Sequence, residues 1–335
     1  MNTIAISYDH LFRLSDDCGI FEHAKLTEPR IENGYCVDDV ARALVVAVRE
    51  PEPDEQLLAL TQVYLKFLVD ALTEDGRFHN RRDVDLSWRD EPSLDDHWGR
   101  GLWGLGSVVA HRPDLAEAAL AHFTIGARRR SPWPRAMAFA ALGAAEVLRA
   151  VPGNQCAREL LASASALIGA PTRTLDWRWP QPRLEYANAV LAEAILVAGE
   201  ALGEGRTHAD GLVMLRWLLE VETSGDHLSV TPVDGWSAGE PRPGFDQQPI
   251  EVATLADACA RAYDHTGHQK WKDAVLLCEA WFRGVNDSGT SLIDSNSGGC
   301  CDGLEPTGRN ENQGAESTLA LISTLQQVRR LQRSP

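Results

Sequence analysis

Acidic residues recur in this chain at or just before the start of its apolar helical segments. Carboxyl groups placed in this way can act in pairs, because a protonated one can donate to a leaving oxygen while an ionised one activates water or attacks carbon. Cleavage of a glycosidic bond needs such a pair on opposite sides of the bond, about 6.5–9.5 Å apart for inversion or about 5 Å for retention. The candidates for direct chemistry are Asp39, Asp96, Glu185, Asp246, Glu251 and Glu316.

A structural role competes with the chemical one at each adjacent acidic pair. An aspartate near a helix N-terminus caps free N–H groups and complements the helix dipole, so one member of Asp38–Asp39 and one of Asp95–Asp96 is expected to be structural. Asp38 could also pair with Arg42 four residues later, which would keep its carboxyl group ionised. In the loop from Phe245 to Glu251 the sequence leaves open which acid is the base.

Residues suited to binding a sugar lie in the same loops. The segment from Asp95 to Arg100 brings carboxylates, an imidazole, an indole and a guanidinium within about two helical turns. Indole faces cover the apolar faces of a pyranose, and carboxylate, guanidinium and amide groups bind its hydroxyls. Burial in the core is the alternative for His97 and Trp98. The predicted substrate-binding residues are Tyr35, Asp38, Arg42, Trp88, Asp95, His97, Trp98, Arg100, Trp177, Trp179, Trp236, Gln247, Gln248 and Asn312.

The segments that must position these residues are helical. Apolar residues spaced by three and four predict helices over 56–72, 136–151, 185–202, 251–263 and 315–331. A layout recurs six times, in which a polar, aromatic, Gly/Pro-rich loop precedes a helix of small aliphatic residues and a more amphipathic helix follows. The six repeats begin at Asn33, Pro92, Pro132, Pro182, Phe245 and Asn310.

Small apolar residues suit an inner ring of helices buried on both sides, whereas amphipathic helices suit an outer ring. The chain is therefore expected to be all-α: one (α/α)6 toroid over residues 1–335, with short extended pieces in the rim loops near 75–80, 175–180, 226–230 and 291–294. An open helical solenoid is the alternative, but unequal loops rich in Trp, Asp and Asn favour a closed ring.

Composition narrows the classes of partner. The net charge of −16 disfavours nucleic acid and acidic membrane surfaces. The chain shows no secretory signal and no 18-residue apolar run, so a cytoplasmic location and no membrane contact are expected. Seven scattered cysteines indicate reduced thiols. Zinc-ligand spacing, phosphate-binding loops and dinucleotide motifs are missing, so neither a metal nor a cofactor is expected.

The layout resembles the six-hairpin glycosidase superfamily. The segment ENGYCVDDVARAL from Glu32 to Leu44 is similar to the GY-x-x-DD-x-x-R-A-L opening of a bacterial branch often associated with glycosyltransferases. The segments DDHWGRG from Asp95 and NENQGAE from Asn310 are the other sharp motifs. The resemblance implies a toroidal fold, a carbohydrate ligand, an inverting course of hydrolysis and a glycosyltransferase as a possible partner.

Three functions are compatible with these residues. The first is a glycoside hydrolase acting on a short oligosaccharide. The second is a sugar epimerase or isomerase, in which His79, His97 or His227 would move protons beside a carbonyl. The third is a non-catalytic sugar-binding partner of a glycosyltransferase. The third helix start, from Trp133 to Met137, carries no carboxylate, which predicts a pocket with one more apolar or basic wall.

Overall fold

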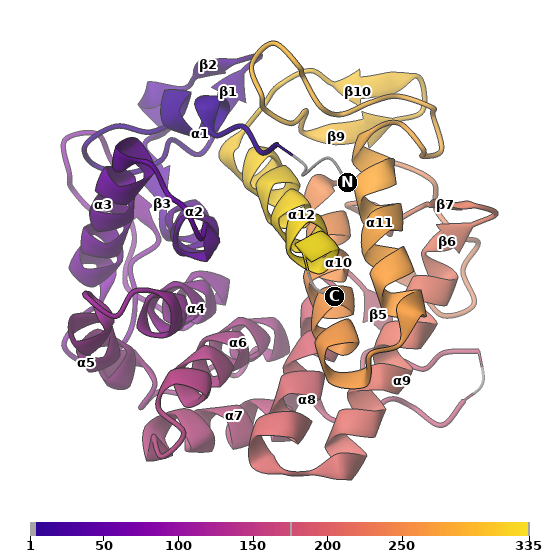
Figure 1. Cartoon of the computed structure of the whole chain (residues 1–335), viewed down its shortest axis with the longest axis horizontal. Helices are drawn as coiled ribbons and strands as arrows, with labels where there is room; N and C mark the ends of the chain where they lie inside the picture. Colours follow the sequence, from indigo (N-terminus) through magenta and orange to yellow (C-terminus); the bar gives the residue numbers. More distant parts are fainter. Residues whose placement is uncertain (1–4, 175, 334–335) are drawn as a thin grey trace.

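The computed structural model describes residues 5–174 and 176–333, and twelve α-helices within these residues form a double ring (Figure 1). The inner ring consists of α2 (Val37–Arg49), α4 (Asp96–His111), α6 (Pro134–Ala150), α8 (Ala189–Leu202), α10 (Pro249–Thr266) and α12 (Ala315–Arg333). The outer ring consists of α1 (Asp9–Arg13), α3 (Glu55–Ala71), α5 (Ala116–Gly126), α7 (Gln155–Ile168), α9 (Gly205–Val221) and α11 (Gln269–Phe282).

Each inner helix packs against the next one along the chain, and the last of them, α12, returns to pack against α2. The outer helices α3, α5, α7, α9 and α11 each pack against the inner helix that precedes them, while the five-residue α1 packs against α12. The ring in Figure 1 is therefore closed between the two ends of the chain. The predicted (α/α)6 toroid is confirmed, and the open solenoid is excluded.

Small residues allow the inner helices to approach closely. Most residues of α4 and α6 are buried, as expected for helices covered on both sides. Gly106 of α4 faces Gly143 of α6, and a Cβ atom at Gly106 would lie 2.3 Å from the Gly143 carbonyl oxygen. No larger residue than glycine fits at Gly106 while the two helices stay this close. Although the inner helices are apolar, no helix in the described parts of the chain is both long and apolar enough to cross a membrane.

We expect Gly106→Ala to lower the free energy of unfolding by about 1–3 kcal/mol, because the added methyl group must push α4 away from α6. Gly153→Ala is the matched control: Gly153 lies in an exposed turn with no atom within 4 Å of the position that a methyl group would take, and its effect should stay within about 0.5 kcal/mol. Urea unfolding followed by circular dichroism measures both. Equal stability of the two variants would contradict close packing at Gly106.

Short strands lie in the loops at the rim. They are β1 (Ala24–Lys25), β2 (Glu28–Pro29), β3 (Tyr35–Cys36), β4 (Arg81–Arg82), β5 (Arg183–Leu184), β6 (Thr223–Ser224), β7 (His227–Leu228), β8 (Trp236–Ser237), β9 (Gly303–Glu305) and β10 (Gly308–Asn310), with a 3-10 turn at Ile31–Asn33. All pairs are antiparallel: β1–β2, β3–β4, β5–β8, β6–β7 and β9–β10. The β3–β4 and β5–β8 pairs join loops of different hairpins, so they tie neighbouring parts of the rim together.

The predicted extended pieces are present in part. Segment 226–230 contains β7, and Phe78 and Ile293 form isolated bridges within segments 75–80 and 291–294. Leu175 lies outside the described residues, and 176–180 contain no strand. One helix also differs from expectation: α8 begins at Ala189 rather than at Glu185, because residues 185–188 form a turn in which Ala187 has a φ of 47°. This turn places Tyr186 at the centre of the site described next.

Candidate active site

The N-terminal ends of the inner helices open into a cavity of about 820 Å³. That volume is within the range of small-molecule sites, roughly 300–1,000 Å³. Its walls come from the starts of α2, α4 and α6, the loop between α3 and α4, and the loop before α8. The lining residues are Asp38, Asn80, Arg81, Asp90, Glu91, Ser93, Asp95, Asp96, His97, Trp133, Pro134, Arg135, Gln181 and Glu185.

Tyr186 joins two buried arginines at the inner ends of the helices. Its hydroxyl oxygen accepts from Arg42 Nη1 and from Arg100 Nη2, each at 3.0 Å, and its O–H donates to Glu316. Arg42 Nη1 also donates to Glu316 at 2.6 Å. The network therefore connects α2, α4, the turn before α8 and the start of α12. Tyr186 was not among the residues predicted for the site; its position in the polar start of the fourth repeat was the available signal.

The adjacent acids Asp38 and Asp39 have different roles. Asp39 is only 2% exposed, and its carboxylate accepts from Arg42 Nη2 at 2.6 Å and from the Cys36 thiol at 3.0 Å. Asp38 lines the cavity with a side chain that is 20% exposed, and it accepts from Arg100 Nη1 at 2.5 Å. Asp39 therefore neutralises Arg42 outside the cavity lining, and its predicted role in the chemistry has no support in the geometry, whereas Asp38 is the carboxylate that reaches the cavity.

The other acidic pair, Asp95 and Asp96, lies at the start of α4. Asp95 occupies the N-cap position of α4 and accepts from the Ser93 hydroxyl at 2.6 Å, while Asp96 is the half-buried first residue of that helix. Both line the cavity. Asp96 therefore shares the cavity with Asp38, and the two approach it from neighbouring inner helices.

The surroundings of Asp38 and Asp96 shift the pKa values of these two carboxyl groups in opposite directions. Burial acts to raise the pKa of Asp38, but the charges of Arg100 and Arg42 outweigh it and hold that pKa below its usual value. Burial raises the pKa of Asp96, and the nearby charges of Arg100 and Arg135 offset this only in part. One cavity carboxyl group is thus held ionised while the other is biased toward its protonated form.

Glu185 and Glu316, also predicted for direct chemistry, differ in position: Glu185 lines the cavity, whereas Glu316 lies outside its lining, in the network of Arg42. The side chain of Glu185 is 54% exposed and lies 3.5 Å from Arg135 Nη1. Glu316 is partly exposed and carries the ion pair with Arg42. Glu185 can accept hydrogen bonds from a ligand in the cavity in addition to its contact with Arg135.

Glu251 is buried away from the cavity lining. Its carboxylate accepts the backbone N–H of Ala187 at 2.5 Å and that of Asn188 at 3.1 Å, and the Asn188 side-chain amide also donates to it. These bonds hold the turn that contains Tyr186. Glu251 thus lies outside the cavity lining and supports this turn, and its predicted catalytic role has no support in the geometry.

We expect Glu251→Gln to lower the free energy of unfolding by about 1–3 kcal/mol, because an amide cannot accept on both of its ends and one buried N–H group of the turn loses its partner. The matched control is Glu74→Gln, an exposed glutamate in the loop after α3, which should be neutral within about 0.5 kcal/mol. Denaturant unfolding checks the pair. A Glu251→Gln protein as stable as the control would show that the turn does not depend on this carboxylate.

The fifth helix start contributes less to the cavity than predicted. Asp246 is exposed and does not belong to the cavity lining, so its predicted role as base has no support in the geometry. Gln247 is fully buried; its Oε1 accepts from the Val230 N–H and from Trp281 Nε1, which makes it a link between loop and core. Gln248 is the N-cap residue of α10 and also lies outside the lining.

The tryptophans predicted to stack on a sugar are used for packing: Trp88, Trp98, Trp177, Trp179 and Trp236. Trp98 and Trp179 are fully buried. Trp177 packs edge-on against Trp236, with 5.4 Å between ring centroids, under the loop that precedes α8. Trp88 stacks on His79 at 5.0 Å. Loops of this length need an apolar cluster beneath them, and these rings supply it.

Trp133 is the indole that lines the cavity. It is 57% exposed and precedes α6 as its N-cap residue. Pro134 and Arg135 extend the same wall, so the helix start without a carboxylate forms an aromatic and basic side of the cavity. The signal in the sequence was the Pro132–Trp133–Pro134 segment, since flanking prolines keep a residue in extended conformation before a helix.

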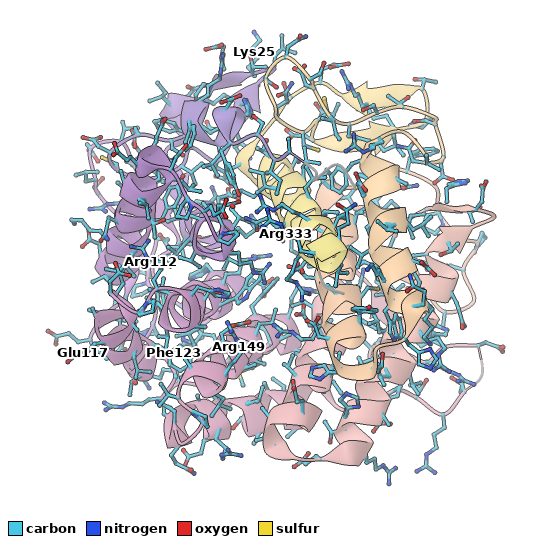
Figure 2. All side chains as sticks on the ribbon, viewed as in Figure 1. Lys25, Arg112, Glu117, Phe123, Arg149 and Arg333 are labelled. Carbon is cyan, nitrogen blue, oxygen red and sulfur yellow. The ribbon has the colours of Figure 1, made fainter. Side chains whose placement is uncertain are left out.

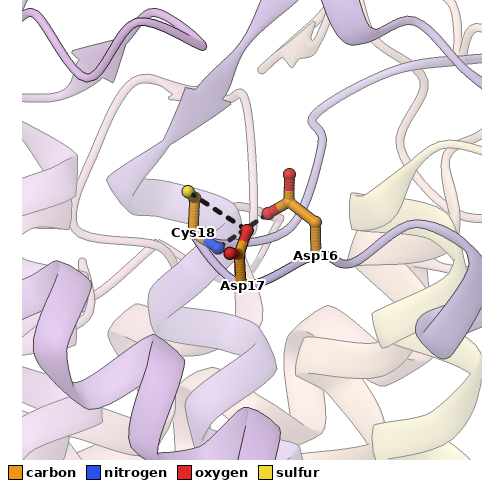
Figure 3. Close-up of side chains that lie close together, drawn as sticks. All are labelled: Asp16, Asp17 and Cys18. Atoms are coloured by element: carbon orange, nitrogen blue, oxygen red, sulfur yellow. Dashed lines mark hydrogen bonds between the residues drawn. The ribbon is translucent and has the colours of Figure 1, made fainter.

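Tyr35 and Asn312 support the rim from outside the cavity lining. Tyr35 is buried, and its O–H donates to Asp16 Oδ2 at 2.6 Å. Asp16 Oδ1 accepts from the Cys18 N–H within a turn, which accounts for the cluster of Asp16, Asp17 and Cys18 in Figure 3. Asn312 Oδ1 accepts the backbone N–H of Leu26 at 2.9 Å, which ties the last loop to the β1–β2 hairpin.

Among the described residues, two groups of side chains are close enough together to hold a metal ion: the cluster of Asp16, Asp17 and Cys18, and a group formed by Glu22, Cys36 and Asp39. In the second group, Arg81 pairs with Glu22, and Arg42 pairs with Asp39. Both carboxylates are therefore already compensated by guanidinium groups. These ion pairs account for the clustering without an ion.

His79, His97 and His227, the imidazoles considered for proton transfer, do not face one another across the cavity. His97 lines the cavity, but its Nε2 lies 3.0 Å from the Phe78 carbonyl oxygen. The Nδ1 atom of His79 contacts the Asp90 carbonyl oxygen. His227, in the β6–β7 hairpin, pairs with Asp287, which follows α11. Neither His79 nor His227 belongs to the cavity lining.

Comparison with known proteins gives a match in fold only. No protein-family model matches the chain, and no curated protein matches its sequence. A sugar epimerase from a ruminal bacterium matches with a TM-score of 0.76 at 12% identity, over 98% of this chain and 95% of its own. Cellobiose 2-epimerase from Spirochaeta thermophila DSM 6192 matches with a TM-score of 0.67 at 13% identity, over 96% and 92%.

The cellulase Cel9M of C. cellulolyticium in complex with cellobiose matches with a TM-score of 0.63 at 8% identity, over 93% of this chain and 88% of its own. These proteins share the six-hairpin (α/α)6 toroid, and the resemblance inferred from the sequence is confirmed for the fold. The chain is thus a six-hairpin toroid with a carboxylate-rich cavity. Both sugar epimerases and cellulases occur among the proteins with this fold, so the fold leaves the reaction open.

Proposed function

We propose that this chain is a glycoside hydrolase that cleaves a short oligosaccharide. The observation that carries the proposal is that Asp38 and Asp96 share one cavity while their pKa values are moved in opposite directions. A pair of carboxyl groups separated in this way supplies an acid and a base at the same pH.

In the proposed reaction Asp96 donates its proton to the glycosidic oxygen of the leaving sugar. Asp38 accepts a proton from a water molecule whose oxygen attacks the anomeric carbon, so the bond to the leaving oxygen breaks as the new C–O bond forms. Arg100 holds the Asp38 carboxylate in place and keeps it ionised. An inverting course follows from the superfamily resemblance.

The remaining lining residues fit the binding of a sugar. The exposed face of Trp133 can cover the apolar face of a pyranose, while Glu185 can accept from its hydroxyl groups. The proteins of similar fold are described as acting on or binding sugars, and this supports a carbohydrate ligand. Because the cavity lining carries six carboxyl groups and two arginines, we propose a neutral rather than an anionic sugar.

A sugar epimerase or isomerase is the second candidate, favoured by the fold similarity to proteins with those activities. Such chemistry would need groups that move protons beside a carbonyl, and His97 is the one imidazole in the cavity lining. Its Nε2 is already in contact with a backbone oxygen. Because the imidazole of His97 is occupied in this way, the geometry favours a hydrolase over an epimerase or isomerase. A non-catalytic sugar-binding partner of a glycosyltransferase is the third candidate.

We expect a screen of neutral oligosaccharides, measured by the appearance of new reducing ends, to identify a substrate. On that substrate Asp38→Asn and Asp96→Asn should each lower kcat by about 100-fold or more, the contribution typical of a general acid or base. Asp226→Asn, at a fully exposed aspartate in the β6–β7 hairpin, is the matched control and should retain turnover. Conversion of the sugar without new reducing ends would indicate an epimerase, and tight binding without conversion would indicate a binding protein.

The pKa shifts also predict the pH dependence of kcat. Activity should fall at low pH when Asp38 is protonated, and this limb should lie below the usual range of aspartate because the pKa of Asp38 is lowered. Activity should fall again at higher pH when Asp96 loses its proton, and this limb should lie above that range because the pKa of Asp96 is raised. A pH–kcat profile measures both limbs.

Arg135→Gln should move the alkaline limb further up in pH, because it removes one of the charges that lower the pKa of Asp96. Arg112→Gln, at an arginine just after the C-terminal end of α4 that pairs with Asp114, is the control and should leave both limbs in place. An alkaline limb that stays fixed or moves down in Arg135→Gln would contradict the assignment of Asp96 as the proton donor.

A further inference from the structure

A second cavity, of about 670 Å³, lies at the opposite end of the ring, where the inner helices end. Figure 2 shows Arg149 and Arg333 beside the central opening on this side of the molecule. Six arginines and four carboxylates take part in the lining, in a chain whose overall charge is −16. The charged lining residues are Arg49, Arg149, Arg261, Arg329, Arg330, Arg333, Glu146, Glu193, Asp257 and Asp264.

The buried carboxylates of this cavity hold the arginines in fixed orientations. Glu146 has a side chain that is 7% exposed, and it accepts from Arg149 Nη2 at 2.7 Å and from Arg261 Nη2 at 2.9 Å. Asp257, equally buried, accepts from Arg49 Nη1 at 3.1 Å. These acids lie behind the guanidinium groups, which are more exposed than their partners.

Each of these guanidinium groups keeps a donor that the protein does not use. Within the described chain, no hydrogen bond is formed by Nη1 of Arg149, Nη1 of Arg261 or Nη2 of Arg49. None of these nitrogens is a buried atom without a partner. Arg333, in the last turn of α12, forms no ion pair among the described residues. Arg329 pairs with Glu50 at 2.6 Å, so six arginines face five carboxylates here. The cavity thus presents several oriented N–H donors.

We propose that this cavity binds a small anion that carries phosphate groups. The lining contains six arginines and no lysine. The planar guanidinium group of arginine can form paired hydrogen bonds with the oxygens of a phosphate group. The C-terminal ends of the six inner helices bring negative partial charge to this side, which stabilises the arginines and opposes an anion. A ligand must therefore form several charge-assisted hydrogen bonds at once, which the oxygens of linked phosphate groups can do.

This site is separate from the carboxylate cavity. The space along the ring axis between the two, lined by Arg42, Phe139 and Asp257 among others, has a volume of about 30 Å³. That is roughly the room taken by one water molecule and too small for a sugar or a phosphate ester. Binding of the anion is therefore expected with no oligosaccharide present, and its test does not depend on the proposed hydrolysis.

Titration calorimetry of the full chain with inorganic pyrophosphate, at ionic strength held constant with NaCl, tests the proposal. We expect saturable binding of one pyrophosphate per chain. The double variant R149Q/R333Q should bind about tenfold more weakly or worse, the loss that corresponds to one or two charge-assisted hydrogen bonds. R112Q, which removes an arginine outside the cavity lining, is the matched control and should keep the wild-type affinity.

Thermal unfolding without ligand first establishes that each variant is folded. If the double variant is not folded, R333Q alone serves, because Arg333 lies in the last turn of α12 and has no ion pair to lose among the described residues; about threefold weaker binding is expected. Absence of binding to the wild type beyond the NaCl background would overturn the proposal. An unchanged affinity in the folded R333Q or R149Q/R333Q protein would overturn it as well.

Discussion

Arg42 occupies the inner side of the first ring helix, where its guanidinium group is almost completely removed from water. A buried charge is stable only when nearby groups compensate it, and its partners come from three parts of the chain: Asp39 in the same helix, Tyr186 before α8 and Glu316 at the start of α12. Glu316 can reach Arg42 only if α12 returns to α2. Closure of the ring and completion of this network are therefore one structural requirement.

The same requirement divides the acidic residues into two groups. Asp39 and Glu251 are buried against a guanidinium group and a backbone turn, so their charges are used by the fold. Asp38 and Asp96 keep access to the cavity, and the arginines around them set how readily each holds a proton. At the first end, arginines control the carboxyl groups that reach the cavity. At the other end of the ring, buried carboxylates instead orient arginines that keep unused donors.

The fold is shared with sugar epimerases and cellulases at only 8–13% sequence identity. Such a low identity is compatible with one fold because the inner ring requires small apolar residues at many positions rather than particular ones, as the close contact of Gly106 with Gly143 illustrates. Reaction type depends instead on the side chains at the helix starts. In this chain carboxylates dominate there, and the one imidazole in the lining is already in contact with a backbone oxygen.

The sequence by itself determined the ring of six hairpins and the acidic helix starts, because helical periodicity and loop composition are local properties that can be read along the chain. Which acid faces the cavity was decided by the tertiary structure: Asp38 and Asp39 are adjacent, but successive side chains on a helix point about 100° apart. Tyr186, Trp133 and Glu251 acquired their roles in the same way. Their partners lie far away in sequence, as Glu251 does from Ala187, and only packing of the ring brings them together.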